Sequence, residues 1–555
     1  MEPIRRSPFL LLTLLFALVV SGCAEHDSIG RPAEPFQGTE ALSEDGERLG
    51  TVVFPTSCKA SVQPDLERGL ALLHHMTYVQ AERVFRAAAE DDPECAIAYW
   101  GAAMTYVHPL WSDVTPDEKI VAGRELLDRA VSAGHRNERE ESYIAAARGY
   151  FDGDGRGKSD RLTDFLAGWA AAHGDHPEDV EAKLFHSLAL MATAPASDNP
   201  LEKRETAGAM AEEVLADFSR HPGAHHYIIH AYDSPPLAKR ALRTARSYGE
   251  IAPENSHALH MTSHIFTRLG LWPESITFNI RAAEAARERL PDGMISGHHL
   301  HALDYLAYAY LQTAEDAAAQ DVLHALESLE PPFQDDAATA YAFAAGPVRY
   351  ALERRDWKAA ASVHPGWPAV VNWDRYPHLL AISQFSRALG AARTGDFTAA
   401  QAAIDELALL EEKASALRTA YDWGIQVALQ KTAAEAWLAY EQGDKARALQ
   451  LMQEAAAMEA STEKSPVTPG EVLPAAELLA DMLRDMGQHE NAITQYEVSL
   501  GRSPNRFHSL FGAGRAAEAV GNVEAAKRYY LKLLAICPEP TGDRPELAHA
   551  RAFVG

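Results

Sequence analysis

The feature that most constrains the fold of this chain is a repeat of 34 residues near its C-terminus. Four residues recur in the same order one period later: Gly487, Ala492, Tyr496 and Pro504, and then Gly521, Ala526, Tyr530 and Pro538. Glycine permits a tight turn between two helices, and alanine lets the helices approach closely. The aromatic ring fills the space beneath them, and proline ends the second helix. The period therefore predicts stacked pairs of antiparallel helices.

Weaker copies of this pattern occur upstream, and alternating β-branched runs that would predict a sheet are absent from the sequence. The copies are MTYVQAERVFRAAAEDDP with Ala81, Phe85, Ala88 and Pro93; RTGDFTAAQAAI with Gly395, Asp396 and Ala400; and EQGDKARALQLM with Gly443, Asp444 and Ala448. The period and residue order resemble the tetratricopeptide repeat. The resemblance implies an all-α solenoid of helical hairpins, wound as a right-handed superhelix of roughly ten units. We expect this array to cover residues 58–540, with a C-terminal tail at 541–555.

The N-terminus has the order of features found in an export signal. Arg5 and Arg6 precede an apolar run of 12 residues, Phe9 to Val20, which is too short to span a bilayer as a mature helix. The sequence Val20-Ser21-Gly22-Cys23 then resembles the cleavage site of bacterial lipoproteins. We expect residues 1–22 to be removed, Cys23 to carry lipid, and residues 23–57 to form a flexible tether. The alternative is an ordinary secretory signal followed by a chance cysteine.

The lipoprotein resemblance implies a location in the bacterial cell envelope. Because Asp does not follow Cys23, the pattern resembles that of proteins sent to the outer membrane, with the folded part facing the periplasm. The formal net charge is −27, from 51 basic and 78 acidic residues. Such a chain repels phosphate backbones, so we expect no nucleic-acid partner and membrane attachment only through the lipid.

Three cysteines remain for an oxidising compartment once Cys23 is assigned to lipid. Cys58 precedes the first repeat, and Cys95 follows the second helix of that repeat. A Cys58–Cys95 disulfide would tie down the entry of the fold, and two buried free thiols are the alternative. Cys537 has no obvious partner.

Ten of the 24 histidines fall between His221 and His301, within a histidine-rich part of the array at 221–314. Pro236 and Gly270 stand at turns between helices, one period apart. They therefore predict repeats at 222–255 and 256–289. A third repeat is expected to begin near Leu300 and to turn at Ala314. Within each repeat the histidines are spaced three, four or seven apart, which places them on one helix face.

In tetratricopeptide proteins the second, fifth and ninth positions of each first helix line the concave groove. Three successive first helices carry side chains of ligand type at these positions: His226 and His230; His257, His260 and His264; and His301, Asp304 and Tyr308. Imidazole and carboxylate are ligands for Zn, Fe, Cu or Ni. We therefore predict a transition-metal site of His226, His230, His257, His260, His264, His301 and Asp304. Asp233 and Tyr308 are expected to lie behind these ligands and orient them.

Other interpretations stay open at this point. The same surface would also suit acid–base chemistry, or a polar peptide without metal. His225 is expected in the core, and His74 and His75 are expected to be structural. His221, His298 and His299 lie at repeat edges, as capping or solvated residues. No HEXXH motif occurs in the sequence.

Four segments resemble a group of bacterial tetratricopeptide proteins of unassigned role. They are FPTSCKASVQPDLERGLALLHHMTYVQAERVF, DDPECAIAYWGAAM, HPGAHHYIIHAYD and ENSHALHMTSHIFTRLG. The resemblance supports the fold and export, and it offers no activity. The first hypothesis is therefore a lipid-anchored binding protein that holds a protein, peptide or small molecule in a histidine-lined groove. The alternative is a metal-dependent hydrolase or oxygenase that uses the same groove, and a third possibility is a pure assembly scaffold.

Overall fold

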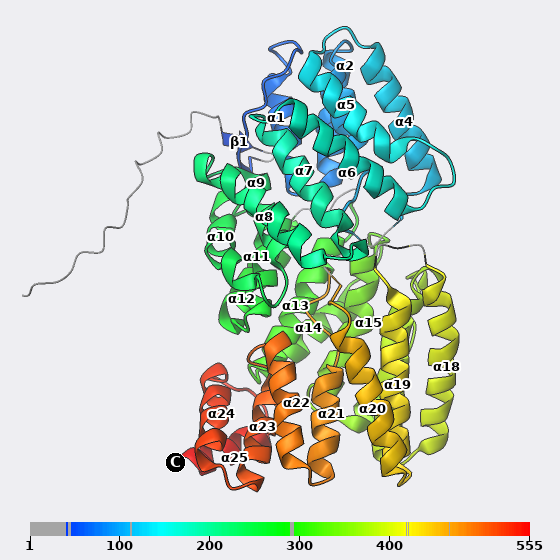
Figure 1. Ribbon diagram of the computed structural model, residues 1–555, viewed down its shortest axis with the longest axis vertical. Helices are drawn as coiled ribbons and strands as arrows, with labels where there is room; N and C mark the ends of the chain where they lie inside the picture. The colour runs from blue at the N-terminus through cyan, green and yellow to red at the C-terminus, as the bar shows by residue number, and fades with distance from the viewer. Residues whose placement is uncertain are drawn as a thin grey trace, which may run out of the picture. The chain divides into compact units, whose positions relative to one another are not determined.

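The described part of the chain contains twenty-five α-helices. They follow one another mostly as antiparallel pairs (Figure 1). The computed structural model describes residues 40–42, 46–111, 114–288, 293–417, 419, 421–465 and 467–555. Helices α1 to α24 form twelve consecutive hairpins. The protein is therefore an all-α, tetratricopeptide-like helical solenoid, as the 34-residue period predicts. The expected signal peptide, Cys23 and the first part of the expected tether lie outside the described residues.

The described chain begins with two short strands, β1 (Glu40–Leu42) and β2 (Arg48–Thr51), which pair antiparallel. The N–H of Thr51 donates to the carbonyl of Arg220 at 3.0 Å, and Leu49 and Phe54 are fully buried. Residues 46–57, which the sequence places in the tether, therefore lie against the solenoid. Leu49, Val52 and Phe54 pack into the core formed with helices of the solenoid, so this part of the chain is anchored to it.

The first four hairpins contain α1 (Gln63–His74), α2 (Tyr78–Asp91), α3 (Ala96–Met104), α4 (Asp117–Ser132), α5 (Glu138–Phe151), α6 (Lys158–Asp175), α7 (Val180–Thr193) and α8 (Pro200–Asp217). Phe85 of α2 is fully buried against two glycines of neighbouring helices. A Cβ at Gly69 or Gly101 would lie 2.9 or 2.3 Å from its ring. Cys58 and Cys95 form a disulfide with their Cα atoms 4.8 Å apart, so of the two alternatives the structure contains the bridge.

The histidine-rich hairpins contain α9 (Pro222–Tyr232), α10 (Ala238–Ile251), α11 (Ser256–Arg268), α12 (Trp272–Glu288), α13 (Gly297–Gln312) and α14 (Asp316–Ser328). Their boundaries follow the repeat register. Gly270 ends one first helix with a φ of +64°, and Ala314 follows the next with a φ of +58°. A Cβ at Gly270 would meet the carbonyl oxygen of Pro504 at 2.2 Å, so a glycine is needed there.

The last hairpins contain α15 (Ala337–Leu352), α16 (Trp357–Ala361), α17 (Pro377–Thr394), α18 (Phe397–Ser415), α19 (Trp423–Glu441), α20 (Lys445–Ala460), α21 (Ala475–Asp485), α22 (His489–Arg502), α23 (Phe507–Ala519) and α24 (Val523–Ile536), followed by α25 (Pro545–Val554). The expected C-terminal tail at 541–555 contains α25. Arg544 is buried in an ion pair with Asp316 at 2.6 Å, and α25 packs on α24.

The segment 461–474, between α20 and α21, returns to the histidine-rich hairpins. Lys464 Nζ lies 2.9 Å from Asp233 Oδ2, across 231 residues of sequence. Further along the segment, the carbonyls of Gly470 and Glu471 accept hydrogen bonds from Arg349 of α15. A distant part of the chain therefore covers helices that a simple solenoid would leave open. Among the described residues, no helix is both long enough and apolar enough to cross a membrane.

Candidate metal centre

Six histidines of the neighbouring helices α9, α11 and α13 form two groups of three. We call His226, His230 and His257 the outer triad, and His260, His264 and His301 the inner triad. Within each triad, one ring nitrogen from every member lies within 4.8 Å of the others. The ring of His230 in the outer triad is 6.2 Å from that of His264 in the inner triad. The structure thus gathers all six predicted histidines, but into two clusters.

In the inner triad, the hydrogen bonds fix which ring nitrogen of two histidines carries the proton. The amide nitrogen of Asn279 donates to the carbonyl of Ser275 at 2.8 Å, so Asn279 Oδ1 faces His260. His260 Nδ1–H donates to that oxygen at 2.8 Å. His264 Nδ1–H donates to Asp233 Oδ2 at 3.0 Å. Because a neutral imidazole carries one proton, the Nε2 atoms of His260 and His264 are both left as lone pairs.

These two Nε2 atoms lie 3.1 Å apart. Two lone pairs at this distance repel each other unless a cation, either a proton or a metal ion, lies against them. The hydroxyl of Tyr305 is 3.3 Å from His264 Nε2 and offers one hydrogen bond. The Tyr305 hydroxyl makes no hydrogen bond with His260 Nε2. His301, whose ring centroid is 4.2 Å from that of His260, adds a buried Nδ1 with no hydrogen-bond partner. The inner triad therefore has the electronic character of a cation site.

The outer triad contains several buried nitrogens without partners. His226 Nδ1–H donates to the carbonyl of His74 at 2.6 Å, which leaves its Nε2 as a free lone pair. His230 Nε2 and both ring nitrogens of His257 are also buried without a hydrogen bond. A buried nitrogen of this kind is costly unless a ligand or water satisfies it. The ring of Trp111 stacks on His257 at 6.1 Å and closes one side of the triad.

Burial keeps the six imidazoles neutral. Desolvation lowers the pKa of His226 to about 3, and it lowers the pKa of His257, His260 and His301 well below 6.5. Nearby imidazoles lower these pKa values further. Burial also lowers the pKa of His264, although the carboxylate of Asp233 acts in the opposite direction. Neutral imidazole is the form that binds metal ions.

Asp233 lies behind the inner triad, where the sequence predicts it. Besides accepting from His264, its carboxylate pairs with Arg268 at 2.8 Å and with Lys464 at 2.9 Å. The two cations hold the pKa of Asp233 well below its usual range, against the effect of burial. Burial lowers the pKa of Lys464 to about 8. With both oxygens occupied, Asp233 orients His264 and is not itself a ligand.

Asp304 and Tyr308 lie outside both triads, which corrects two predicted roles. The Asp304 carboxylate faces the guanidinium of Arg349, with Oδ1 3.4 Å from Nε. Burial raises the pKa of Asp304 to about 6. The Tyr308 hydroxyl accepts a hydrogen bond from Arg506 at 3.0 Å, and Arg349 lies over the Tyr308 ring. An arginine of the chain thus takes the place next to Asp304 that the prediction gave to a metal.

The prediction of an open, histidine-lined groove is also corrected. His257, His260, His264 and His301 are no more than 4% exposed. Trp111 stacks on His257, and Lys464 pairs with Asp233 behind His264. Only His230 is half-buried. It lines a cavity whose wall also includes Trp111, Arg204, Asp233, Tyr421 and Lys464. The cavity is therefore the approach from solvent to the outer triad.

Most of the remaining histidines of the region make structural contacts. His225 is buried and stacks on Tyr248, as expected for a core residue. His221 caps α9 by accepting from the N–H of Ala224, and His299 Nδ1–H donates to the carbonyl of Ala283. His298 is half-buried, 4.8 Å from the ring of His257. His75 is buried, and its two ring nitrogens contact the Tyr248 hydroxyl and the Leu49 carbonyl.

Two further groups have metal-ligand composition but are chemically closed. The Glu181 carboxylate accepts hydrogen bonds from His74 at 2.7 Å and from His221 at 3.0 Å, so its ligand atoms are already satisfied. Cys58 and Cys95, which lie near Asp92, are joined as a disulfide and offer no thiolate. No pattern in the sequence indicates that His74 pairs with Glu181.

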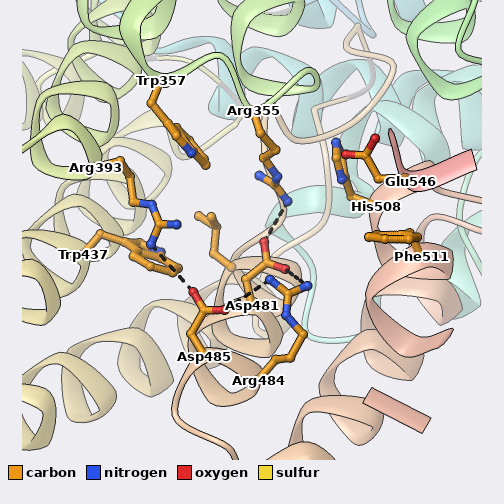
Figure 2. A pocket seen from close by; sticks show the side chains of 11 residues that line it. Arg355, Trp357, Arg393, Trp437, Asp481, Arg484, Asp485, His508, Phe511 and Glu546 are labelled. Atoms are coloured by element: carbon orange, nitrogen blue, oxygen red, sulfur yellow. Dashed lines mark hydrogen bonds and ion pairs between the residues drawn. The ribbon is translucent and has the colours of Figure 1, made fainter. Parts of the chain in front are cut away.

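A separate cavity is lined by side chains of α16, α17, α19, α21, α23 and α25, together with Arg355, which precedes α16 (Figure 2). Its arginines are paired with carboxylates. Arg355 bonds Asp481 at 2.8 Å, Arg484 contacts Asp481 and Asp485, and Arg393 lies 3.8 Å from Asp485 (Figure 2). Glu546 also lines the cavity, and its buried Oε2 has no hydrogen-bond partner. Because the triads gather several buried ring nitrogens without partners, we place the candidate site there.

Several residues that support the triads have no signal in the sequence. Asn279 lies on the second helix of its repeat, and Trp111 follows α3. Lys464 comes from a segment between two other helices. Each is identified only by its contacts in the folded chain. Tyr305 of α13 is placed by its hydroxyl, which lies 3.3 Å from His264 Nε2.

Similarity to known proteins gives no function that could be transferred to this chain. No family model matches the chain, and no curated protein matches it. Among solved structures, the chain is similar to the human IFIT1 dimer with PPP-AAAA. The two share 11% sequence identity, the match covers 86% of this chain and 91% of that chain, and the TM-score is 0.34. A likeness at this level carries no inference about ligand or activity, which must come from the chain's own residues.

Proposed function

We propose that this protein binds a transition-metal ion in the inner triad, His260, His264 and His301. The observation that carries the proposal is the 3.1 Å contact between the Nε2 atoms of His260 and His264. Asn279 and Asp233 hold both Nδ1 protons, so both Nε2 lone pairs face one point. Metal-binding histidines in proteins usually donate their other ring N–H to a carbonyl or carboxylate in this manner.

The donor set favours particular metals. Three neutral imidazoles suit Zn, Cu, Ni or Fe, whereas Mg and Ca prefer oxygen ligands. The inner triad has no thiolate or carboxylate ligand, since Asp233 is occupied by Arg268, Lys464 and His264. Three protein ligands also leave one position open in a four-coordinate ion.

The open position supports a second candidate function, a metal-dependent enzyme. In catalytic zinc sites, three protein ligands and one exchangeable water are typical. Tyr305, whose hydroxyl lies 3.3 Å from His264 Nε2, would stand beside that position as a hydrogen-bond donor. The tetratricopeptide-like fold equally suits a protein that holds a ligand or partner, which is the first hypothesis.

We also propose export and lipid attachment through Cys23, as the sequence resemblance implies. A periplasm-facing location suits the Cys58–Cys95 disulfide, since disulfides persist in oxidising compartments. The ligand or partner held by the solenoid is then one found in the cell envelope.

Metal analysis of untagged protein tests the proposal. Protein purified without a histidine tag is stripped, reloaded with Zn(II), Cu(II) or Co(II), desalted and analysed for bound metal. We expect tight binding to the wild type and loss of the inner ion from His264→Ala. His489→Ala is the control, since His489 is half-buried and belongs to neither triad. Wild-type protein that retains no metal, or a His264→Ala variant that binds as the wild type does, contradicts the proposal.

A further inference from the structure

The two triads are related by one repeat of the solenoid. His226 and His230 of α9 lie 34 residues before His260 and His264 of α11. Each pair is completed by a histidine of the next first helix, His257 in α11 for the outer triad and His301 in α13 for the inner triad. His257 lies three residues before His260, and His301 lies three residues before Asp304. The same three repeat positions therefore carry histidine twice. The first set lies between α9 and α11, and the second lies between α11 and α13.

The same positions between α13 and α15 hold a cation. One repeat further, Asp304 and Tyr308 of α13 replace the histidine pair. Arg349 of α15 enters beside them, with its guanidinium 3.4 Å from Asp304 and 4.8 Å from the Tyr308 ring centroid. The third space thus contains a cation supplied by the chain itself. The first two spaces have neutral nitrogen donors in the equivalent positions.

We propose that the outer triad, His226, His230 and His257, holds a second transition-metal ion, and that this ion exchanges its fourth ligand with an anion from the adjoining cavity. The inference rests on the proposed function in assuming that the inner triad also holds an ion. Points related by one repeat are separated by the spacing of packed helices, about 8–10 Å. The two ions are therefore separate centres without a bridging ligand.

The surroundings of the triads assign different roles to the two ions. His260, His264 and His301 are at most 4% exposed, and none of them lines the cavity. His230 does line it, together with Arg204 and Lys464. Three neutral imidazoles leave the charge of a divalent ion uncompensated, and Asp233 is already paired with Arg268 and Lys464. A small anion is thus the fourth ligand that this site favours electrostatically.

Copper loading with azide as the probe anion tests the inference. Stripped protein is loaded with Cu(II), desalted, analysed for copper and titrated with azide, whose binding gives a charge-transfer band. We expect two Cu(II) and one azide per wild-type chain. His230→Ala and His257→Ala should each keep one Cu(II), the inner one, and lose the azide band. His301→Ala should keep one Cu(II) and retain the band.

The matched control is His225→Ala, which removes a buried imidazole from α9 that belongs to neither triad. It should keep two Cu(II) and the azide band, so that loss caused by a cavity in α9 is separated from loss of a ligand. Circular dichroism of every variant checks that the helices remain folded.

The outcomes separate the two proposals. A wild type that binds no copper overturns the proposed function. A wild type that binds one Cu(II), lost in His301→Ala and kept in His230→Ala, overturns only the second site. One Cu(II) that every triad variant removes means a single shared ion and also overturns it. An azide band that persists in both His230→Ala and His257→Ala overturns the assignment of the exchangeable ligand to the outer ion.

Discussion

Asn279→Leu tests the reasoning about the inner triad without removing a ligand. In the wild type, Asn279 Oδ1 accepts from His260 Nδ1 at 2.8 Å and so keeps the proton off Nε2. Leucine has the same branched heavy-atom skeleton as asparagine but cannot accept a hydrogen bond. His260 would then move its proton to Nε2 and donate it to His264 Nε2, 3.1 Å away. This hydrogen bond occupies the lone pair that a metal ion needs.

The size of the effect follows from these contacts. Loss of a hydrogen-bond partner behind a metal ligand typically weakens metal binding by about 10–100-fold. This corresponds to roughly 1.4–2.7 kcal/mol of binding free energy. The metal-free fold should lose less, about 1–2 kcal/mol, since the bonds of Asn279 to Ser275 and His260 are neutral and His260 gains a new partner.

The assay is a competition between the protein and a chromophoric chelator for Zn(II), with thermal unfolding of the metal-free protein measured alongside. The control is Thr277→Leu, on the exposed side of the same helix. Selective ¹⁵N labelling of histidine adds a direct readout, because the nitrogen shifts distinguish the Nδ1–H from the Nε2–H form. We expect weaker binding at the inner triad in Asn279→Leu, and a changed tautomer of His260 in the metal-free variant.

Two results would refute the reasoning. The first is a metal-free wild type in which His260 carries its proton on Nε2, because the facing lone pairs would then not exist. The second is an Asn279→Leu variant that is correctly folded and binds Zn(II) at the inner triad as tightly as the wild type does. Equal weakening in Thr277→Leu would instead assign the effect to the helix as a whole.

Three further predictions concern other parts of the chain. The Cys58–Cys95 bridge spans 37 residues, so replacing both cysteines with serine should destabilise the first hairpins by about 4 kcal/mol; unchanged amide exchange in α1 and α2 would contradict this. Burial lowers the pKa of His378 to about 3, so this residue stabilises the fold as a neutral group above pH 6.5 and loses that contribution as the pH falls. Between pH 6.5 and 4.5 the wild type should lose about 2 kcal/mol more than His378→Phe, measured by urea unfolding, and parallel pH profiles would contradict this. Labelled palmitate should enter the wild-type protein in cells but not Cys23→Ser, and equal labelling of both would exclude lipid at Cys23.

The sequence by itself determined the helical hairpins and their register. Turns, helix packing and helix ends depend on local residues, so a glycine, an alanine and a proline at fixed spacing suffice to place them. For that reason Gly270 and Ala314 fall at the expected turns, and His226, His230, His257, His260, His264 and His301 fall on faces that meet. The packing of residues 46–57 on the solenoid could not be predicted, because the burial of Leu49 and Phe54 depends on distant helices.

Only the tertiary structure decided how the histidines are used. A repeat register states which face of each helix a residue occupies, but not what covers that face. Lys464 arrives from 231 residues away, and Trp111 from a different hairpin, to close the expected groove. Asp304 has the same register position as His260, yet it faces Arg349 because α15 follows α13. The division into two triads, and the proton positions that leave Nε2 free, arise from contacts between residues remote in sequence.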